Sequence, residues 1–418
     1  MKKELPHKLN ICLTSKKFPI IGRAADHSHL WMIAKKLAKK GHRITVLAGV
    51  SQQNFTEVEE AGVQVFYLNN KRTLADKDFQ LKVKEKFTDL HAKEPFDLIH
   101  SVDSSGRKII NHYKHLKIPT ALDIEATNIS QIFSILGMTQ ESIGSAMRTS
   151  FAVLYKFLRT YYGNDRSIIR HAHGIFVSSP QQRLMLERYY LYPDKRIYTV
   201  AYGLEIQEEQ KQENTAHLME GLNLSPNHNI LLTVTDMAEF QEMSNILRAF
   251  EKLVIKKPNS RLVIVGNGPK RKELEHETYK LALGNMVHFV GAIKNIEYPD
   301  YISLADIFIN LSSRSTGFEP SILEAMSQKK IVIASEVSAL SSLVEDRRDG
   351  FLVRPADIDG ISQLLLDIIN ESIPVLEIGD RARRKVKSYF DQDKMITNTI
   401  DAYYDILVNS GFYKRMKL

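Results

Sequence analysis

The sequence predicts an α/β protein built from two doubly wound parallel sheets. Short apolar runs that suit buried strands alternate with longer segments that suit helices along almost the whole chain. The strand runs are nearly continuous in apolar character, which is typical of parallel strands covered by helices on both faces. A polar stretch rich in Glu and Gln, EIQEEQKQENTAHLMEGLNLSPNHN, separates two such series.

The first series opens with the strand run LNICLT, a helix over HLWMIAKKLAKKGH and the strand run RITVLA. In this helix Leu30, Ile33, Ala34 and Leu37 share one face, and Gly41 marks its end because glycine readily adopts the left-handed conformation found there. The later elements are, in order, VQVFYL, a polar helix from Asp76 to Ala92, FDLIHS, a helix around Lys108, PTALDI, a helical region from Asn128 to Arg170, GIFVSS, a helix from Pro180, and RIYTVAYG.

The second series follows an entry helix in the polar stretch. Its strand runs are NILLTVT, SRLVIVGNGP, MVHFVG, ADIFINL, KIVIAS and GFLV, each followed by a helical segment. The tail from Ser388 carries apolar residues at helical spacing. We therefore expect an N-terminal domain over residues 1–205, a C-terminal domain over residues 206–387 and a terminal helix over residues 388–418.

Composition places the chain among globular proteins. Of its 418 residues, 43% are hydrophobic and 25% are charged. Cys12 is the single cysteine, so the chain cannot form an internal disulfide or a cysteine-based zinc site, which fits a reducing cytoplasm. No apolar run approaches the ~20 residues that span a bilayer, and the N-terminus lacks the apolar core of a signal peptide. We expect a soluble or peripheral protein.

The charge balance is basic, with a formal net charge of +8 and a pI near 9.1. This favours anionic partners. Nucleic acid is not expected, because no zinc finger, RNP-like motif or helix-turn-helix pattern is present in the sequence. The basic and aromatic segment SIGSAMRTSFAVLYKFLRTYYGNDRSIIR suits peripheral contact with an anionic membrane, and packing on the first sheet is the alternative interpretation.

The segment from Ala305 to Val353 contains the most informative turn. The strand run IFIN is followed by the polar turn SSRSTGFEP and by a helix that starts at SILEAM. The first backbone N–H groups of such a helix have no internal partners and favour an anion. A phosphate or a set of sugar hydroxyls would fit here, and an ordinary strand–turn–helix connection is the alternative.

This segment resembles the family 4 retaining glycosyltransferases, also described as glycosyl transferases group 1. Their hallmark is a pair of glutamates around a Gly-Phe turn, followed by Ala-Met; Glu324 matches the second glutamate, and Thr316 stands at the first. The resemblance extends over nearly the whole chain through KKGHRITVLAG, HAHGIFVSSPQQ, TVAYGLE, GNGP and MVHFVGAI. It implies the GT-B fold, in which two Rossmann-like domains face a central cleft. The N-terminal domain would be the acceptor side, the C-terminal domain the donor side, and the terminal helix would cross back to the N-terminal domain.

The resemblance also implies roles for single residues. Glu324 would hold the nucleotide ribose, and Glu319 is placed to replace the missing acid, so both are candidate catalytic residues. The loop after Val290 would hold the base by backbone contacts. The full set of candidate donor-binding residues is Gly22, Arg23, Gly266, Gly291, Ala292, Ile293, Arg314, Thr316, Gly317, Phe318, Ser321 and Glu324. No metal ligand is expected.

Two further positions depart from the family. A nucleotide-diphosphate leaving group develops negative charge, and relatives neutralise it with an arginine and a lysine after the first strand of the second domain. Asp236 and Gln241 stand there in this chain. Arg23, Lys270, Arg271 and Arg314 are candidate replacements. On the acceptor side, His29 matches a family histidine, and Asp123 and Glu125 stand near a position where active relatives have another.

These features favour a metal-independent, nucleotide-sugar-dependent glycosyltransferase of hexosyltransferase type. It would move a sugar, with retention of configuration, to a glycan, lipid-linked or other acceptor, as in the synthesis of cell-envelope glycans. We expect no cofactor besides the nucleotide-sugar substrate. The expected location is the cytoplasm, including the inner face of the membrane. The alternative is a catalytically inactive glycosyltransferase-like binding or scaffold protein, which the replacements at Thr316, Asp236 and Gln241 favour.

Overall fold

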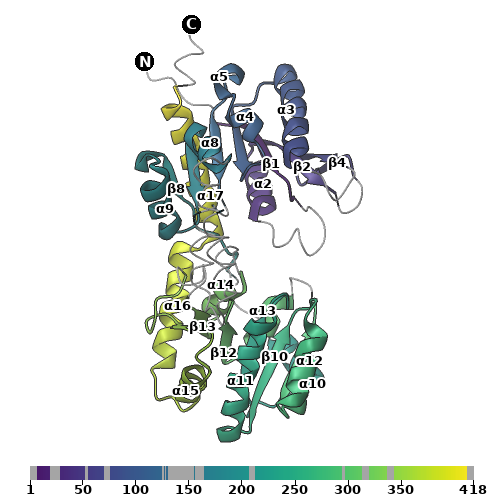
Figure 1. Cartoon of the computed structure of the whole chain (residues 1–418), viewed down its shortest axis with the longest axis vertical. Helices are drawn as coiled ribbons and strands as arrows, with labels where there is room; N and C mark the ends of the chain where they lie inside the picture. Colours follow the sequence, from purple (N-terminus) through teal and green to yellow (C-terminus); the bar gives the residue numbers. More distant parts are fainter. Residues whose placement is uncertain are drawn as a thin grey trace. The chain divides into compact units, whose positions relative to one another are not determined.

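The computed structural model of the chain divides into two compact units (Figure 1). The first consists of Met1–Tyr202 with Asp393–Leu418, and the second of Gly203–Gln392. The structure describes residues 7–18, 29–51, 55–69, 76–124, 127, 129, 155, 164–206, 212–293, 297–312, 320–336 and 343–411.

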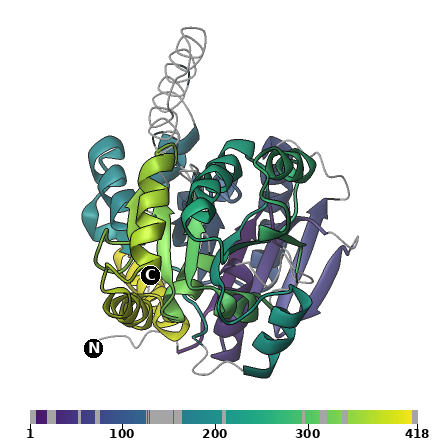
Figure 2. The same ribbon diagram turned by 90° about the horizontal axis from the view of Figure 1, so that it is seen from below.

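Eight strands in the described part of the first unit form one sheet of order β3-β4-β2-β1-β5-β6-β7-β8. Neighbouring strands are parallel, except that β3 pairs with β4 in the antiparallel direction. The purple strands of this sheet lie side by side in Figure 2. The strands are β1 (Asn10–Ser15), β2 (Arg43–Val50), β3 (Glu57–Glu60), β4 (Val63–Asn69), β5 (Leu98–Val102), β6 (Thr120–Asp123), β7 (Gly174–Val177) and β8 (Ile197–Thr199).

The sequence did not predict β3. Its residues, EVEE, are mostly charged and exposed, so the apolar signal of a buried strand is absent. Such a strand is stable only at the edge of a sheet, where one side needs no partner.

The helices of the first unit largely follow the predicted segments. They are α2 (His29–Lys39), α3 (Asp76–Lys93), α4 (Arg107–Ile110), α5 (Tyr113–Leu116), α8 (Asn164–His171), α9 (Pro180–Tyr190), the short η1 (Asp194–Arg196) and α17 (Gln392–Asn409). The helix expected around Lys108 is divided into the single turns α4 and α5. Most of the helical region expected from Asn128 to Arg170 lies outside the described residues.

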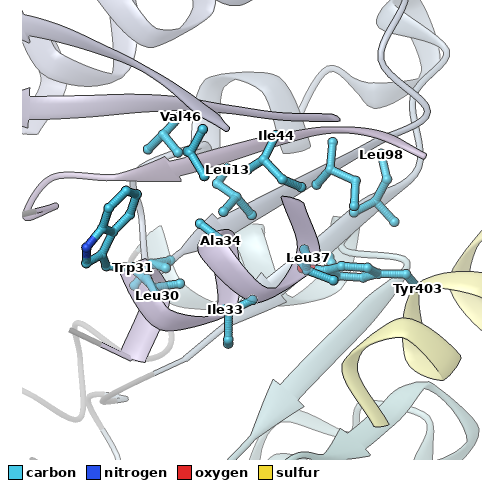
Figure 3. Close-up of a cluster of buried hydrophobic side chains, with 14 of the residues drawn as sticks. Leu13, Leu30, Trp31, Ile33, Ala34, Leu37, Ile44, Val46, Leu98 and Tyr403 are labelled. Carbon is cyan, nitrogen blue, oxygen red and sulfur yellow. The ribbon is translucent and has the colours of Figure 1, made fainter. Parts of the chain in front are cut away.

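The central strands of the first sheet are buried on both faces, with side chains alternating between two cores. On β1, Ile11 and Leu13 join the core formed with α2 and α17, whereas Cys12 points into the core formed with α3. Figure 3 shows the first of these cores, where Leu30, Ile33, Ala34 and Leu37 of α2 lie against the strands. Period-two alternation between two apolar layers explains why these strands read as continuous apolar runs.

The terminal helix α17 belongs to the first unit. Tyr403, Ile406 and Leu407 are fully buried in the same core as α2, and Tyr403 lies near Leu37 in Figure 3. The fit is close against β7, because a Cβ added to Gly174 would lie 2.5 Å from Ile406 Cγ1. The helix therefore completes the core of the first sheet.

Six strands in the described part of the second unit form a parallel sheet of order β11-β10-β9-β12-β13-β14. The strands are β9 (Asn229–Val234), β10 (Ser260–Val265), β11 (Val287–Gly291), β12 (Ile307–Asn310), β13 (Ile331–Ser335) and β14 (Phe351–Val353). The helices are α10 (Gln212–Gly221), α11 (Phe240–Lys256), α12 (Arg271–Lys280), the short η2 (Gly284–Met286), α13 (Tyr298–Leu304), α14 (Pro320–Ser327), α15 (Ile358–Ile369) and α16 (Val375–Tyr389).

Two groups of helices cover the second sheet. In one group α11 contacts both α12 and α15, and α10, α13, α14 and α16 form the other group. In α11, Met243, Ile246, Leu247 and Phe250 recur at helical spacing and are buried against the strands. The predicted class, two doubly wound parallel sheets, is confirmed.

In both sheets, the side on which the chain adds successive strands changes beside the first strand. The chain adds strands on one side of β9 as far as β11 and then crosses to the other side at β12. In the first unit the same change occurs between β1 and β5. Open α/β sheets bind ligands at the carboxyl ends of the strands at such a switch point.

Candidate functional site

Three loops meet at the carboxyl edge of the second sheet. They follow β9, β10 and β11, and the edge continues to β12, which leads into α14. Adjacent strands lie about 4.8 Å apart, so the edge from β11 to β12 spans about 14 Å.

Two glycines bring the loops after β9 and β10 into direct backbone contact. Gly266 has φ +127, and a Cβ placed on it would lie 1.8 Å from the carbonyl oxygen of Thr235. A Cβ on Gly268 would lie 1.7 Å from the carbonyl oxygen of Asp236. No real side chain tolerates such distances, so the GNGP turn requires glycine at both positions.

Backbone hydrogen bonds hold this contact and extend it to β11. The Thr235 N–H donates to Val265 O at 2.9 Å, and the Lys270 N–H donates to Met237 O at 3.1 Å. The Gly266 N–H donates to Gly291 O at 2.8 Å. The structure therefore brings the predicted site residues Gly266 and Gly291 together.

The loop after β11 begins at a buried glycine. Gly291 has φ +86; beyond it, Ala292 is exposed and Ile293 is buried. A buried Ile293 anchors the loop, while Ala292 leaves its backbone accessible. This arrangement suits recognition of a flat ring by backbone groups.

Arg271 lies against this loop. Its guanidinium donates to Phe289 O at 3.3 Å and sits 5.8 Å from the centroid of the Phe289 ring. It also pairs with Glu275 at 2.8 Å, and Lys270 pairs with Glu273 at 2.8 Å. The two candidate replacement cations that the structure describes thus have carboxylate partners on α12.

Asp236 and Gln241 take local roles at the start of α11. The Asp236 carboxylate accepts from the Ala238 N–H at 3.1 Å, and the Gln241 side chain donates to Asn245 Oδ1 at 2.7 Å. Glu239 and the buried Glu242 follow in the same segment. The resulting negative charge opposes binding of a diphosphate at this helix start.

Glu324 lies on α14 and is partly buried. Burial raises the pKa of its carboxyl to about 7, and a hydrogen bond with Gln328 lowers it in part. Gln328 is itself held by donation to Pro299 O at 3.0 Å. Near neutral pH, a ligand hydroxyl that donates to this carboxylate would favour its ionised form.

The first turn of α14 contains a polar atom without a partner. Ser321 Oγ is buried and makes no hydrogen bond within the described structure. It lies one turn before Glu324 on the same short helix, whose first N–H groups also need acceptors. An unsatisfied buried hydroxyl costs about 1–3 kcal/mol, which a bound ligand would recover.

Comparison with known proteins supports the resemblance seen in the sequence. Residues 214–385 match the family model described as Glycosyl transferases group 1, and this range covers most of the second unit. The second unit therefore contains the segment that is similar to this family.

One similar protein matches the chain over nearly its full length. N-acetyl-alpha-D-glucosaminyl L-malate synthase from Bacillus anthracis is 20% identical over 380 residues, which are 90% of this chain and 92% of that protein.

Two solved structures show the same GT-B fold. Sucrose-phosphate synthase from Thermosynechococcus elongatus has a TM-score of 0.75 at 18% identity and covers 96% of this chain and 100% of its own. Anabaena HepE in complex with UDP has a TM-score of 0.69 at 16% identity and covers 94% of this chain and 99% of its own.

Several predicted donor-site residues lie outside the described residues. They are Gly22, Arg23, Arg314, Thr316, Gly317, Phe318 and Glu319. Their roles therefore stay predictions. Gly266, Gly291, Ala292, Ile293, Ser321 and Glu324 are described, and they occupy the loops after β10 and β11 and the helix α14.

Sequence reasoning did not find two residues of the first unit, His100 and Tyr403. Both are buried, and a hydrogen bond joins them across the sequence. In the sequence each looks like an ordinary member of an apolar strand or helix, and only the pairing of β5 with α17 reveals the contact.

The part of the chain that the structure describes has neither a membrane-spanning helix nor a metal-binding cluster. No helix there is long and apolar enough to cross a bilayer. No group of three or more His, Cys, Asp or Glu side chains in that part of the chain is arranged to hold a metal ion.

Substitution of Gly268 should disrupt the glycine turn. Gly268→Ala places a Cβ against the carbonyl of Asp236, and we expect a loss of about 3 kcal/mol or more in the free energy of unfolding. Urea denaturation measures this change. The control is Gly221→Ala at the end of α10, where an added Cβ meets nothing within 4 Å, so its effect should stay within about 1 kcal/mol. Equal effects of the two substitutions would contradict the predicted backbone contact.

The raised pKa of Glu324 predicts a pH-dependent stability. An unfolded glutamate titrates near 4.3 and the folded one at about 7, so wild-type protein loses stability relative to Glu324→Gln as pH rises through this window. Below about pH 4 the two proteins should be equally stable, and at pH 8 the variant should gain about 1–2 kcal/mol. Exposed Glu220→Gln is the control, and a pH-independent difference for Glu324→Gln would exclude this cause.

Proposed function

We propose that this chain transfers a hexose from a nucleotide-sugar donor to a hydroxyl-bearing acceptor, with retention of configuration at the sugar carbon. The observation that carries the proposal is Glu324, a partly buried carboxylate at the switch point of the second sheet, whose pKa is raised by burial. A structural role would favour a neutral or exposed side chain there, because burial disfavours its charge. A ligand with paired hydroxyls, such as a ribose, would supply donors to that carboxylate.

The dimensions of the carboxyl edge support an elongated ligand. The loop of Gly291, Ala292 and Ile293 and the helix bearing Glu324 stand at opposite ends of an edge about 14 Å long. A single sugar ring is too short to contact both. A nucleotide-sugar with its ribose near Glu324 would extend its base, which is bonded directly to that ribose, along this edge toward the loop after β11.

The charge distribution favours α14 over α11 as the phosphate site. The start of α11 carries Asp236, Glu239 and Glu242, whereas the first turn of α14 has the Ser321 hydroxyl, which makes no hydrogen bond within the described structure. In our proposal the turn before α14 contributes Arg314, Thr316, Gly317 and Phe318 to the sugar and phosphates. Glu319 replaces the missing acid at Thr316, and Gly22 and Arg23 complete the donor contacts.

The two units would divide the substrates. We assign the donor to the second unit and the acceptor, a glycan or lipid-linked molecule of the cell envelope, to the first. We further propose that the enzyme works in the cytoplasm, at the inner face of an anionic membrane. The net charge of +8 supports this location by attracting the protein to anionic lipids.

A binding or scaffold protein without transferase activity is the second candidate. The local hydrogen bonds of Asp236 and Gln241 favour it, because the two cations expected to stabilise the leaving group are replaced by side chains engaged elsewhere. One lost charge-stabilising donor typically costs about 3 kcal/mol of barrier. This candidate predicts nucleotide or sugar binding without turnover.

Calorimetric titration with UDP, GDP and ADP tests the donor site. We expect micromolar binding of one nucleotide, with UDP tested first because the similar HepE structure contains UDP. Glu324→Ala should weaken this binding by about tenfold or more, through loss of charge-assisted hydrogen bonds to the ribose. Glu220→Ala on exposed α10 is the control. Absence of binding for all three nucleotides would refute the donor site.

A further inference from the structure

Three large apolar side chains are exposed at the end of α9. Leu184, Tyr189 and Leu191 are 46%, 49% and 75% exposed, and all three fall within eight positions of sequence. Elsewhere in the described part of the chain, no stretch of this length holds more than one exposed large apolar side chain. Single exposed apolar residues are ordinary, whereas a cluster of them marks a surface that contacts a partner.

The packing of α9 fixes which of its side chains point outward. Leu186 and Tyr190 are buried in the core formed with β7 and β8. Leu184 and Arg188 are four positions apart on an exposed face, and Leu191 follows three positions later, just past the helix end. Because β8 is the last strand of its sheet, α9 lies at the outer edge of the first unit (Figure 1).

Leu191 has a backbone conformation that disfavours leucine. Its φ is +52, in the left-handed region, and it caps the C-terminal end of α9. Glycine or asparagine usually stands at such a helix end, because the Cβ of other residues crowds a carbonyl oxygen. Among the described non-glycine residues with positive φ, the only other large apolar side chain is Met237, which is fully buried. Packing within the chain therefore does not explain a leucine here.

Hydrogen bonds hold this exposed surface in place. The Tyr192 N–H donates to Leu186 O at 3.2 Å, and the Tyr192 hydroxyl donates to Ala172 O at 2.9 Å. Arg183 ties the following loop to α9, because its Nη1 donates to Ile197 O at 3.1 Å. The exposed side chains therefore stand on a preformed tip of the first unit.

The charges around the apolar side chains are mainly positive. Residues 183–196 hold four basic and two acidic side chains. Both acidic ones, Glu187 and Asp194, pair with Arg183. Arg188 and Lys195 are exposed and have no carboxylate partner in the part of the chain that the structure describes. Such cations beside leucine and tyrosine match an anionic lipid surface, where apolar side chains insert and cations contact the headgroups.

A lipid bilayer fits this surface better than a second protein does. A stable protein interface buries about 800 Å² on each partner and is depleted in lysine. Three exposed apolar side chains on one helix end do not supply such an area. They suffice for shallow insertion at a membrane interface, where tyrosine is also enriched.

We propose that Leu184, Arg188, Tyr189, Leu191 and Lys195, which together form the α9 patch, bind the surface of an anionic lipid bilayer. This rests on the proposed location at a membrane and identifies the surface that makes the contact. The patch belongs to the first unit, to which we assign the acceptor. Binding therefore brings the acceptor side of the protein to lipid-linked molecules.

Vesicle flotation tests the partner. Wild-type protein should float with vesicles of phosphatidylcholine mixed with phosphatidylglycerol. It should bind vesicles of phosphatidylcholine alone about tenfold more weakly, because Arg188 and Lys195 attract anionic lipid only. Binding to the anionic vesicles should also fall as salt is raised. Absence of binding to anionic vesicles, or equal binding to both kinds, would overturn the proposal.

Leu191→Asn separates a membrane contact from a structural role. Asparagine tolerates the left-handed conformation, so the variant should unfold at the same or a higher urea concentration than wild type. Its affinity for anionic vesicles should nevertheless fall about tenfold, through loss of an inserted apolar side chain. Ile255→Asn on α11 is the matched control, because Ile255 is likewise 75% exposed, and it should leave vesicle binding unchanged. Equal binding by wild type and Leu191→Asn, or equal losses in the two variants, would contradict the α9 patch.

A second copy of the chain is the other occupant to be tested. Analytical ultracentrifugation without lipid should give the same association state for wild type and Leu191→Asn. A dimer that Leu191→Asn dissociates would assign the patch to self-association and overturn the proposal.

These measurements do not depend on the donor site. UDP affinity without vesicles should be the same in wild type and Leu191→Asn, because Leu191 belongs to the first unit and Glu324 to the second. Failure of wild-type protein to bind any nucleotide would refute the donor site and leave the flotation result intact. Nucleotide binding without flotation would refute the α9 patch alone.

Discussion

Burial of parallel strands on both faces is the constraint on which the rest of this structure depends. Alternate side chains of β1 enter two different apolar cores, and β9, β10, β12 and β13 are likewise buried along most of their lengths. Polar residues that could bind a ligand therefore lie at the ends of the strands, where the chain leaves the sheet. The glycine turn after β10, the loop after β11 and the helix α14 all lie at that edge of the second sheet. The terminal helix α17 satisfies the same constraint in the first unit by covering the sheet beside α2.

A polar group that is nevertheless buried either belongs to a functional site or lowers the stability of the fold. Glu324, Ser321 and His100 each lie in surroundings that disfavour charge or leave a hydrogen-bonding atom unpaired. Glu324 and Ser321 stand at the carboxyl edge of the second sheet, whereas His100 lies in the middle of β5. In contrast, the exposed ion pairs of Lys270 and Arg271 contribute little to stability, because water screens them. The buried groups therefore identify the site better than the surface charges do.

Much of the fold could be predicted from the sequence, because apolar periodicity and glycine positions report local requirements directly. Continuous apolar runs predicted the parallel strands, and the sequence GNGP predicted the turn at Gly266 and Gly268. The edge strand β3 escaped prediction because its residues need no burial. In the candidate site, Glu324 and Gly291 could be predicted from sequence motifs. The pair of His100 and Tyr403 was not, since a contact between residues 303 positions apart depends on packing that no local pattern encodes.

The central claim is that the donor site transfers sugar as well as binding a nucleotide. Turnover of a panel of UDP-, GDP- and ADP-sugars, followed as nucleotide release by chromatography, tests this most directly. The panel should be run with water alone and with methyl α-D-glucopyranoside as acceptor, on wild type and on Glu324→Ala. We predict slow release from one donor in wild type, accelerated by the glycoside and lost in Glu324→Ala. Tight nucleotide binding without release from any donor would contradict a transferase and establish a binding protein.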